Sequence, residues 1–164
     1  MTTVLLVAVL LLAVLTVFNL VLVLGVIRRL RAFEGRPDAG PPMLTAPAGT
    51  RVGDFTSSTV DGSEVSLGSR ALVGFFSTTC PACHERLGDF REAAARHSGA
   101  AFAVVVRDGG GVEPMLAGLG DTPVVVEDPD GPVASAFGVQ GFPAFVLVRA
   151  GVIESTGVQV PVPA

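Results

Sequence analysis

A strand-like apolar run that stops just before a pair of cysteines constrains the fold of this chain more than any other feature. Residues 71–76 are rich in Val and Phe, a short Ser/Thr turn follows, and Cys80-Pro81-Ala82-Cys83 opens a segment with helical periodicity. The pattern predicts a buried strand that delivers two thiols to the first turn of a helix. The unpaired N–H groups and partial positive charge of a helix N-terminus favour a thiolate, so we expect Cys80 to be nucleophilic near neutral pH.

The cysteine pair allows three interpretations. The chain has no other cysteines, so a structural disulfide elsewhere is excluded. Half of a zinc site is a weak interpretation, because zinc takes four ligands and only His84 and His97 could add to the pair. A haem attachment site is a sharper alternative, since residues 80–84 match Cys-x-x-Cys-His letter for letter. The strand-like runs around the motif favour a redox dithiol, because cytochromes of that kind are mostly helical.

An uncharged segment near the N-terminus predicts a membrane anchor. Residues 4–27 contain no charged side chain, and as a helix they would be about 36 Å long, enough to cross a bilayer core. The segment is too long for the apolar part of a cleaved signal, and no Ala-x-Ala site follows it. We therefore expect a transmembrane anchor over residues 1–27, an Arg then Pro/Gly-rich linker over 28–50, one folded domain over 51–157 and a flexible tail over 158–164.

The charge of the chain is distributed unevenly. Four arginines against one glutamate give +3 over residues 1–36, which leaves −7 for the rest of a chain whose net charge is −4. The acidic domain argues against a nucleic-acid partner. We also expect the protein to be a monomer. Arg28, Arg29 and Arg31 follow the apolar segment at once, and positive charge beside a span tends to stay in the cytoplasm. Taken alone, this rule places the domain on the cytoplasmic side.

The domain alternates strand-like and helix-like segments. A tight-turn signal at residues 61–62 predicts a small hairpin over 52–67. Leu87, Phe90 and Ala94 are spaced like one face of a helix that follows the cysteines. Further strands are expected at 101–106, 124–126, 145–148 and 152–155, the last two as a hairpin, and short helices at 114–119 and 132–137. This order predicts an α/β fold with a mixed sheet and helices on its faces.

Four stretches of this sequence carry a family resemblance. They are Gly53-Asp54-Phe55-Thr56, Asp61-Gly62 with Val65-Ser66-Leu67, Phe75-Phe76-Ser77-Thr78-Thr79-Cys80-Pro81-Ala82-Cys83, and Ala136-Phe137-Gly138-Val139-Gln140-Gly141-Phe142-Pro143. Together they resemble the thioredoxin fold, and more narrowly the membrane-anchored TlpA/ResA-like thiol:disulfide oxidoreductases and the related MauD-like proteins. A Cys-x-x-Cys pair alone is a weak signal, but with Gly-Phe-Pro about 60 residues later it is fairly specific.

The resemblance implies a fold, an activity and a site. It implies a thioredoxin-like mixed sheet flanked by helices and preceded by one transmembrane helix. Cys80 would attack a partner disulfide as a thiolate, and Cys83 would resolve the mixed disulfide. The family also implies a cis peptide bond before Pro143, which would lie against the dithiol and leave the Phe142 backbone free to pair with an extended partner segment.

Three residues around the cysteines are expected to support them. Pro81 suits the first helical turn, because the N–H that it lacks would be unpaired there. Ala82 brings no charge, which leaves the helix N-terminus and His84 as the visible stabilisers of a thiolate.

The sequence departs from the family at three positions and at its end. Thioredoxins carry a buried acid six residues before the first cysteine, and this chain has Gly74 there. Thr79 replaces the usual Trp before the motif, and Gly88 replaces the proline of the following helix. Residues 157–164, with two prolines, replace the last amphipathic helix of the family, so we expect that helix to be missing.

We expect protein thiols and disulfides as partners, among them an apocytochrome or another envelope protein, and neither a metal nor another cofactor. A thiol peroxidase is a weaker alternative, because the proline of the peroxide-binding motif is Val73 here. A metal- or haem-delivery chaperone is a further alternative. The resemblance favours a domain outside the cytoplasmic membrane, whereas the arginines beside the span favour the cytoplasmic side.

Overall fold

The computed structural model describes Met1, residues 10–12, 15–16, 19–20 and 44–161. The chain forms two units, Met1–Pro42 and Met43–Ala164. The predicted membrane anchor lies largely outside the described residues, and so does the linker up to residue 43. Within the described part of the chain, no helix has the length and apolar character needed to cross a membrane.

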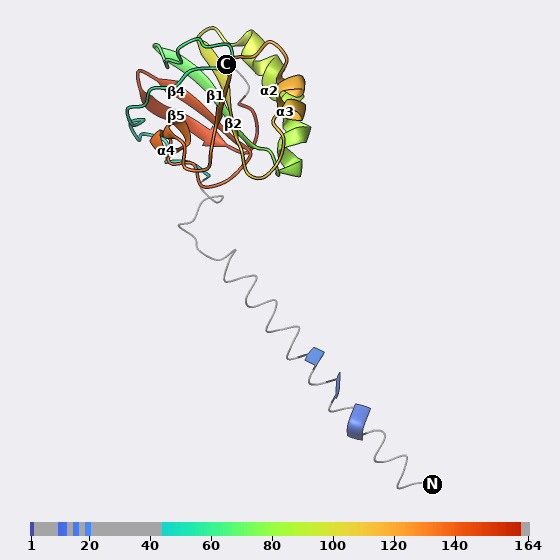
Figure 1. The fold of residues 1–164 in the computed structure, drawn as a ribbon. Helices are drawn as coiled ribbons and strands as arrows, with labels where there is room; N and C mark the ends of the chain where they lie inside the picture. Colours follow the sequence, from blue (N-terminus) through green and yellow to red (C-terminus); the bar gives the residue numbers. More distant parts are fainter. Residues whose placement is uncertain (2–9, 13–14, 17–18, 21–43, 162–164) are drawn as a thin grey trace. The chain divides into compact units, whose positions relative to one another are not determined.

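A five-stranded sheet forms the centre of the second unit (Figure 1). Its strands are β1 (Arg70–Ser77), β2 (Ala100–Val106), β3 (Val124–Glu127), β4 (Ala144–Arg149) and β5 (Val152–Gly157), in the spatial order β3-β2-β1-β4-β5. The first three strands are mutually parallel, while β4 is antiparallel to both β1 and β5. The Val- and Phe-rich β1 is central because its side chains are buried on both faces of the sheet. The predicted mixed sheet is confirmed.

Two helices, α2 (Pro81–Arg96) and α3 (Glu113–Leu119), cover one face of this sheet (Figure 1). The apolar stripe of α2 buries Cys83, Leu87, Phe90 and Ala93. The sequence predicted Ala94 as the last residue of this stripe. In the structure Ala93 takes that place on the side of the helix that faces the sheet, and Ala94 is only partly buried.

An aromatic cluster joins α2 to the sheet. The ring of Phe90 meets Phe76 of β1 edge-on with 5.5 Å between centroids, and it stacks on Phe145 of β4 at 5.8 Å. All three side chains are fully buried. Burial of such a side chain stabilises the fold by about 1.5–3 kcal/mol, so this cluster anchors the helix that carries the cysteines.

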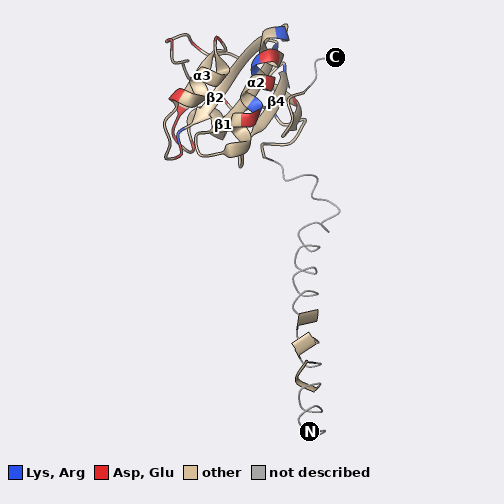
Figure 2. Cartoon of the chain, turned by 90° about the vertical axis from the view of Figure 1, so that its right-hand side faces the viewer, with Lys and Arg blue, Asp and Glu red and all other residues tan. Residues whose placement is uncertain are grey.

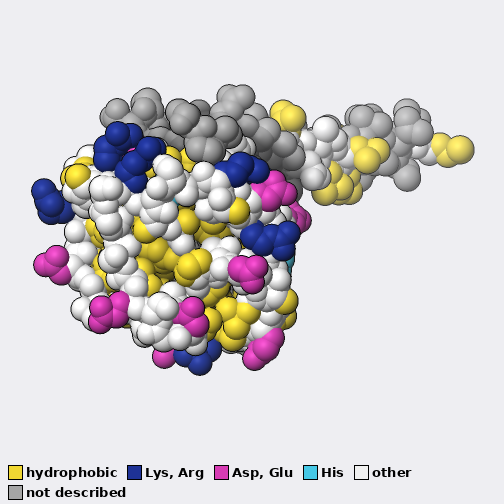
Figure 3. All heavy atoms as spheres, turned by 90° about the horizontal axis from the view of Figure 1, so that it is seen from above, with side chains coloured by type: hydrophobic (Ala, Val, Ile, Leu, Met, Phe, Trp, Pro, Cys, Tyr) yellow, Lys and Arg dark blue, Asp and Glu magenta, His cyan; other side chains and the backbone are white. Residues whose placement is uncertain are grey.

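The outer surface of α2 carries charges of both signs, which Figure 2 shows alternating along the helix. Arg86 pairs with Asp89 at 3.2 Å, and Arg96 pairs with Glu92 at 3.5 Å. The view in Figure 3 likewise shows basic and acidic side chains interspersed around the rim of the domain. Exposed pairs of this kind contribute about 1 kcal/mol at most.

On the opposite face of the sheet lies α4 (Pro132–Ala136) with a second core (Figure 1). Phe137, which follows α4, packs on Phe75 of β1 with 5.1 Å between ring centroids and on Phe55 at 6.1 Å. The chain then runs directly into the Gly-Phe-Pro loop, so this core fixes the approach to that loop.

The hairpin predicted over residues 52–67 is present, but it is shorter than predicted and spans residues 57–65. Around the tight turn Ser58 bridges Glu64, and two backbone hydrogen bonds, at 2.9 and 3.0 Å, flank this bridge. Outside these residues the arms separate, and Arg51 bridges Val152 of β5. Most side chains near the turn are exposed. A two-stranded ribbon that buries so little apolar surface is not stable by itself. The segment is also held by backbone hydrogen bonds from Val60 to Val124 of β3 and from Val52 to Gly151.

The carboxylate of Glu127, at the end of β3, holds the start of α4. It is buried, and it accepts hydrogen bonds from the backbone N–H groups of Val133 at 3.1 Å and Ala134 at 2.8 Å. Burial raises the pKa of Glu127, and the two N–H groups offset part of that effect.

Glu127→Gln is expected to remove a pH-dependent part of the stability. Because the folded pKa is raised, the wild-type protein loses stability as the pH rises from the reference pKa of 4.5 through the folded value, whereas glutamine does not titrate. The free energy of unfolding of the wild type, relative to the variant, should therefore fall with rising pH in urea denaturation. Glu64→Gln, at an exposed glutamate, is the control. A difference that stays constant with pH would contradict the raised pKa.

Candidate functional site

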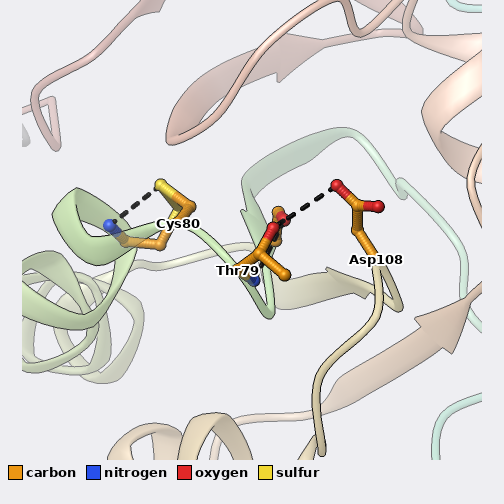
Figure 4. Close-up of a disulfide and its surroundings, with 5 residues drawn as sticks. Thr79, Cys80 and Asp108 are labelled. Carbon is orange, nitrogen blue, oxygen red and sulfur yellow. Dashed lines mark hydrogen bonds between the residues drawn. A yellow bond between two sulfur atoms is a disulfide. The ribbon is translucent and has the colours of Figure 1, made fainter.

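The two cysteines form a disulfide at the first turn of α2 (Figure 4). Cys80 is the N-cap residue, and the backbone N–H of Cys83 donates to the Cys80 sulfur at 3.2 Å. Pro81 stands in the first helical turn, as predicted. The helix N-terminus therefore directs an N–H group and its partial positive charge at the Cys80 sulfur, which stabilises a thiolate when the disulfide is reduced.

The two cysteines differ in access to solvent. Cys83 is 0% exposed and belongs to the core beneath α2, whereas Cys80 is half-buried. Cys80 is therefore the residue that an incoming disulfide can approach, whereas Cys83 is closed to solvent. The difference agrees with an attacking Cys80 and a resolving Cys83, which remain predicted roles.

A polar network ties the turn before Cys80 to the loop after β2. The hydroxyl of Thr79 donates to the carboxylate of Asp108 at 3.4 Å, and the backbone N–H of Asp108 donates to the hydroxyl of Thr78 at 3.0 Å. Ser77 and Thr79 share a further hydroxyl contact at 3.2 Å. Figure 4 shows the Asp108 carboxylate directed at Thr79, with the sulfur of Cys80 on the other side of the turn. The network positions the turn that carries Cys80.

Sequence reasoning missed Asp108. The available signal was its place two residues after the end of β2, which runs parallel to β1, because the carboxyl ends of neighbouring parallel strands meet at one edge of a sheet.

The peptide bond between Phe142 and Pro143 is cis, as expected. Pro143 is buried and Phe142 is half-buried. Residues 44–46, which we had assigned to the linker, lie against the chain just before this loop. The backbone N–H of Ala46 donates to the carbonyl of Phe137 at 2.9 Å, and that of Gln140 to the carbonyl of Leu44 at 2.7 Å. The domain thus begins earlier than residue 51, and its first residues fasten the Gly-Phe-Pro loop.

Ala82 and His84 lie on the outer side of the first turns of α2, and both are exposed. His84 makes no side-chain hydrogen bond within residues 44–161. Its predicted part in stabilising the thiolate remains untested. Among the described residues, no group of three His, Cys, Asp or Glu side chains could hold a metal ion.

Neither a protein-family profile nor a curated protein matches the chain. Solved structures do. The thioredoxin domain of a thiol-disulfide oxidoreductase from Bacteroides vulgatus is 20% identical, with a TM-score of 0.54 over 70% of this chain and 90% of that one. The exposed lipoprotein thioredoxin of Streptococcus pneumoniae is 25% identical, with a TM-score of 0.51 over 63% and 87% of the two chains. A secreted disulfide oxidoreductase of Mycobacterium tuberculosis is 23% identical, with a TM-score of 0.50 over 64% and 83%.

The chain has the thioredoxin fold. The dithiol at the start of a helix and the cis peptide bond before Pro143 are present, as the sequence resemblance implied. At Gly74, where thioredoxins carry a buried acid, there is no room for a side chain. A Cβ placed on Gly74 would lie 2.7 Å from Cε2 of the Phe90 ring. The aromatic cluster beneath α2 therefore occupies the volume that an acidic side chain would need.

The other two departures from the thioredoxin pattern have different consequences. Thr79, in place of the usual Trp, supplies the hydroxyl that reaches Asp108. Gly88, in place of the helix proline, lies within an uninterrupted α2. After β5, residues 158–161 form no helix, and Val160 packs against the core beneath α2. A short segment without regular secondary structure thus covers part of the surface on which the family carries its last helix.

Proposed function

We propose that this protein is a thiol:disulfide oxidoreductase that exchanges disulfides with partner proteins through Cys80 and Cys83. The observation that carries the proposal is the pairing of an accessible sulfur with a buried one at a helix N-terminus. The cis-proline loop and the fold shared with disulfide oxidoreductases add to it.

The exchange takes place in two steps. The Cys80 thiolate attacks a partner disulfide, so one sulfur–sulfur bond forms as another breaks, and the first partner sulfur leaves as a thiolate. The Cys83 thiolate then attacks the Cys80 sulfur, which forms the intramolecular disulfide and releases the second partner sulfur. The partner gains two electrons, and its thiolates take protons from solvent. The reverse sequence oxidises the partner, and the direction follows from the reduction potential of the pair against that of the compartment.

The burial of Cys83 favours exchange over haem attachment. Two thioether bonds would require room for haem beside both sulfur atoms, and Cys83 is packed within the core beneath α2. A peroxidase is disfavoured because Ser77, three residues before Cys80, is buried and bonded to Thr79 rather than open to a peroxide.

The proposed activity is tested by reduction of insulin disulfides with dithiothreitol as the electron source. The protein should accelerate the precipitation of the insulin B chain, and titration against glutathione should give one two-electron reduction potential. Absence of catalysis, or a covalent haem that survives denaturation after expression with haem-ligation machinery, would overturn the proposal.

We propose further that residues 1–27 anchor the protein in the cytoplasmic membrane with the domain outside. The apolar sequence of residues 4–27 supports the anchor. An extracytoplasmic domain is supported by the secreted and exposed proteins that share its fold. Arg28, Arg29 and Arg31 oppose this orientation, but long domains are translocated largely regardless of flanking charge.

We therefore expect a membrane-impermeant maleimide to label the domain in intact cells after mild reduction. A variant that lacks both cysteines controls for labelling of other proteins, and lysed cells give the total signal. Labelling that appears only after lysis would place the domain in the cytoplasm, as the arginines alone predict.

A further inference from the structure

A cavity of about 360 Å³ shares Asp108 with the polar network that precedes Cys80. Its walls come from the residues at the ends of β2 and β3, from α4 and from the loop before Pro143, and they include Val106, Asp108, Asp130, Val139 and Phe142. Two of these residues connect it to the proposed site. Asp108 accepts the hydrogen bond from Thr79, next to Cys80, and Phe142 directly precedes Pro143. A partner segment in contact with both the dithiol and the loop would therefore pass the cavity.

The cavity combines apolar walls with an acidic rim. Val106, Val139 and Phe142 supply buried or half-buried apolar surface, while Asp108 and Asp130 are exposed. The volume lies at the lower end of the range for ligand pockets, which suits one long side chain rather than a larger ligand.

The charges around the cavity are predominantly negative. The nearby arginine, Arg107, already pairs with Asp128 at 3.3 Å, and the carboxylate of Glu127 is turned toward the start of α4. Asp130 makes no side-chain ion pair within residues 44–161, so the negative charge at the rim is not neutralised by a neighbour.

We propose that this cavity is a specificity subsite for a lysine or arginine that lies close to the reacting cysteine of the partner polypeptide. The proposal rests on the proposed function, since it assigns a preference to the same disulfide exchange. The aliphatic stem of either residue would lie on Val106, Val139 and Phe142, and its charged end would reach the carboxylates of Asp108 and Asp130. An extended partner advances about 3.3 Å per residue and a long basic side chain adds its own reach, so the proposal assigns the cavity to a residue one or two positions from the partner's cysteine.

The test uses symmetrical disulfide dimers of short peptides with one cysteine each. The variable residue, one or two positions from the cysteine, is arginine, lysine, norleucine or glutamate. Reduced protein should convert the arginine and lysine dimers to thiols about fivefold faster than the norleucine dimer, and the glutamate dimer most slowly. High salt should shrink these ratios, because the rim charges are exposed.

Asp130→Asn and Asp108→Asn should each lower the ratio of arginine to norleucine rates, and the double variant should bring it close to one. Asparagine suits position 130, whose φ of 63° is left-handed. Asp121→Asn, at an exposed acid near the opposite end of β3, is the matched control and should keep the full ratio. Because a ratio is compared within each variant, a general change in cysteine reactivity after Asp108→Asn cancels.

The outcomes separate the two proposals. Exchange at equal rates for all four peptides would overturn the subsite and leave the proposed function standing. A preference for arginine that persists in the double variant would also overturn it, because the charge would be recognised elsewhere. Failure to exchange with any peptide, together with failure on insulin, would overturn the proposed function and the subsite with it.

Discussion

Cys80→Ser is expected to abolish disulfide exchange, with a loss of at least about a thousandfold in rate. A serine hydroxyl at the helix N-terminus does not ionise near neutral pH and cannot form a disulfide, so the first step has no nucleophile. The substitution removes one sulfur at a half-buried cap position, and serine is itself a good N-cap residue, so the fold should persist. The rate of insulin reduction, together with a circular dichroism spectrum, checks both expectations.

Cys83→Ser is expected to have a different consequence. The first step remains possible, but no second thiol releases the partner, so mixed disulfides through Cys80 should accumulate and appear as higher bands on non-reducing gels. The variant that lacks both cysteines should trap nothing. Equal loss of activity without trapping in either single variant would contradict the assigned roles, and trapping through Cys83 would reverse them.

Gly74→Asp, which installs the acid of the thioredoxin family, is expected to destabilise the fold by more than about 3 kcal/mol. The three atoms nearest to a Cβ at this position all belong to the Phe90 ring, at 2.7–2.9 Å. Gly74 is buried in β1, between β2 and β4, so the backbone cannot move aside easily. The new carboxyl group would face aromatic carbon, and a polar group buried without a partner adds its desolvation cost to the overlap. Urea denaturation measures the loss.

Gly74→Ala separates the two causes, because it introduces the overlap without the carboxyl group. We expect it to cost about 1–3 kcal/mol, less than the aspartate. Phe90→Leu should make room for the methyl group, so the double variant Gly74→Ala/Phe90→Leu should lose less stability than the sum of the two single variants. Strictly additive losses would show that the Phe90 ring does not exclude a side chain at position 74.

The strand, turn and helix around the cysteines could be predicted because each depends on neighbours in sequence. The apolar run of β1, the cap position of Cys80 and the first-turn Pro81 are local features. Helix and strand periodicity likewise placed the other elements to within one or two residues, and the resemblance placed the cis bond before Pro143.

How far the pairing extends within residues 52–67 could not be predicted from the turn signal. A turn sets the geometry of a hairpin, but the apolar area buried by its strands decides how far they pair, and here that area is small. The same limit applies to residues 44–46. Their proline-rich surroundings indicated a linker, while their backbone hydrogen bonds go to Phe137 and Gln140, more than 90 residues later.

By itself, therefore, the sequence determined where the dithiol stands and which secondary structure presents it, because capping and periodicity act over a few residues. Only the tertiary structure showed that Asp108 contacts the turn before Cys80, and that position 74 has no room for an acidic side chain. Asp108 reaches Thr79 only because β1 and β2 are adjacent and parallel, and position 74 is closed only because Phe90 of α2 packs over β1. Both facts depend on volumes and distances between segments that the chain brings together only when it folds.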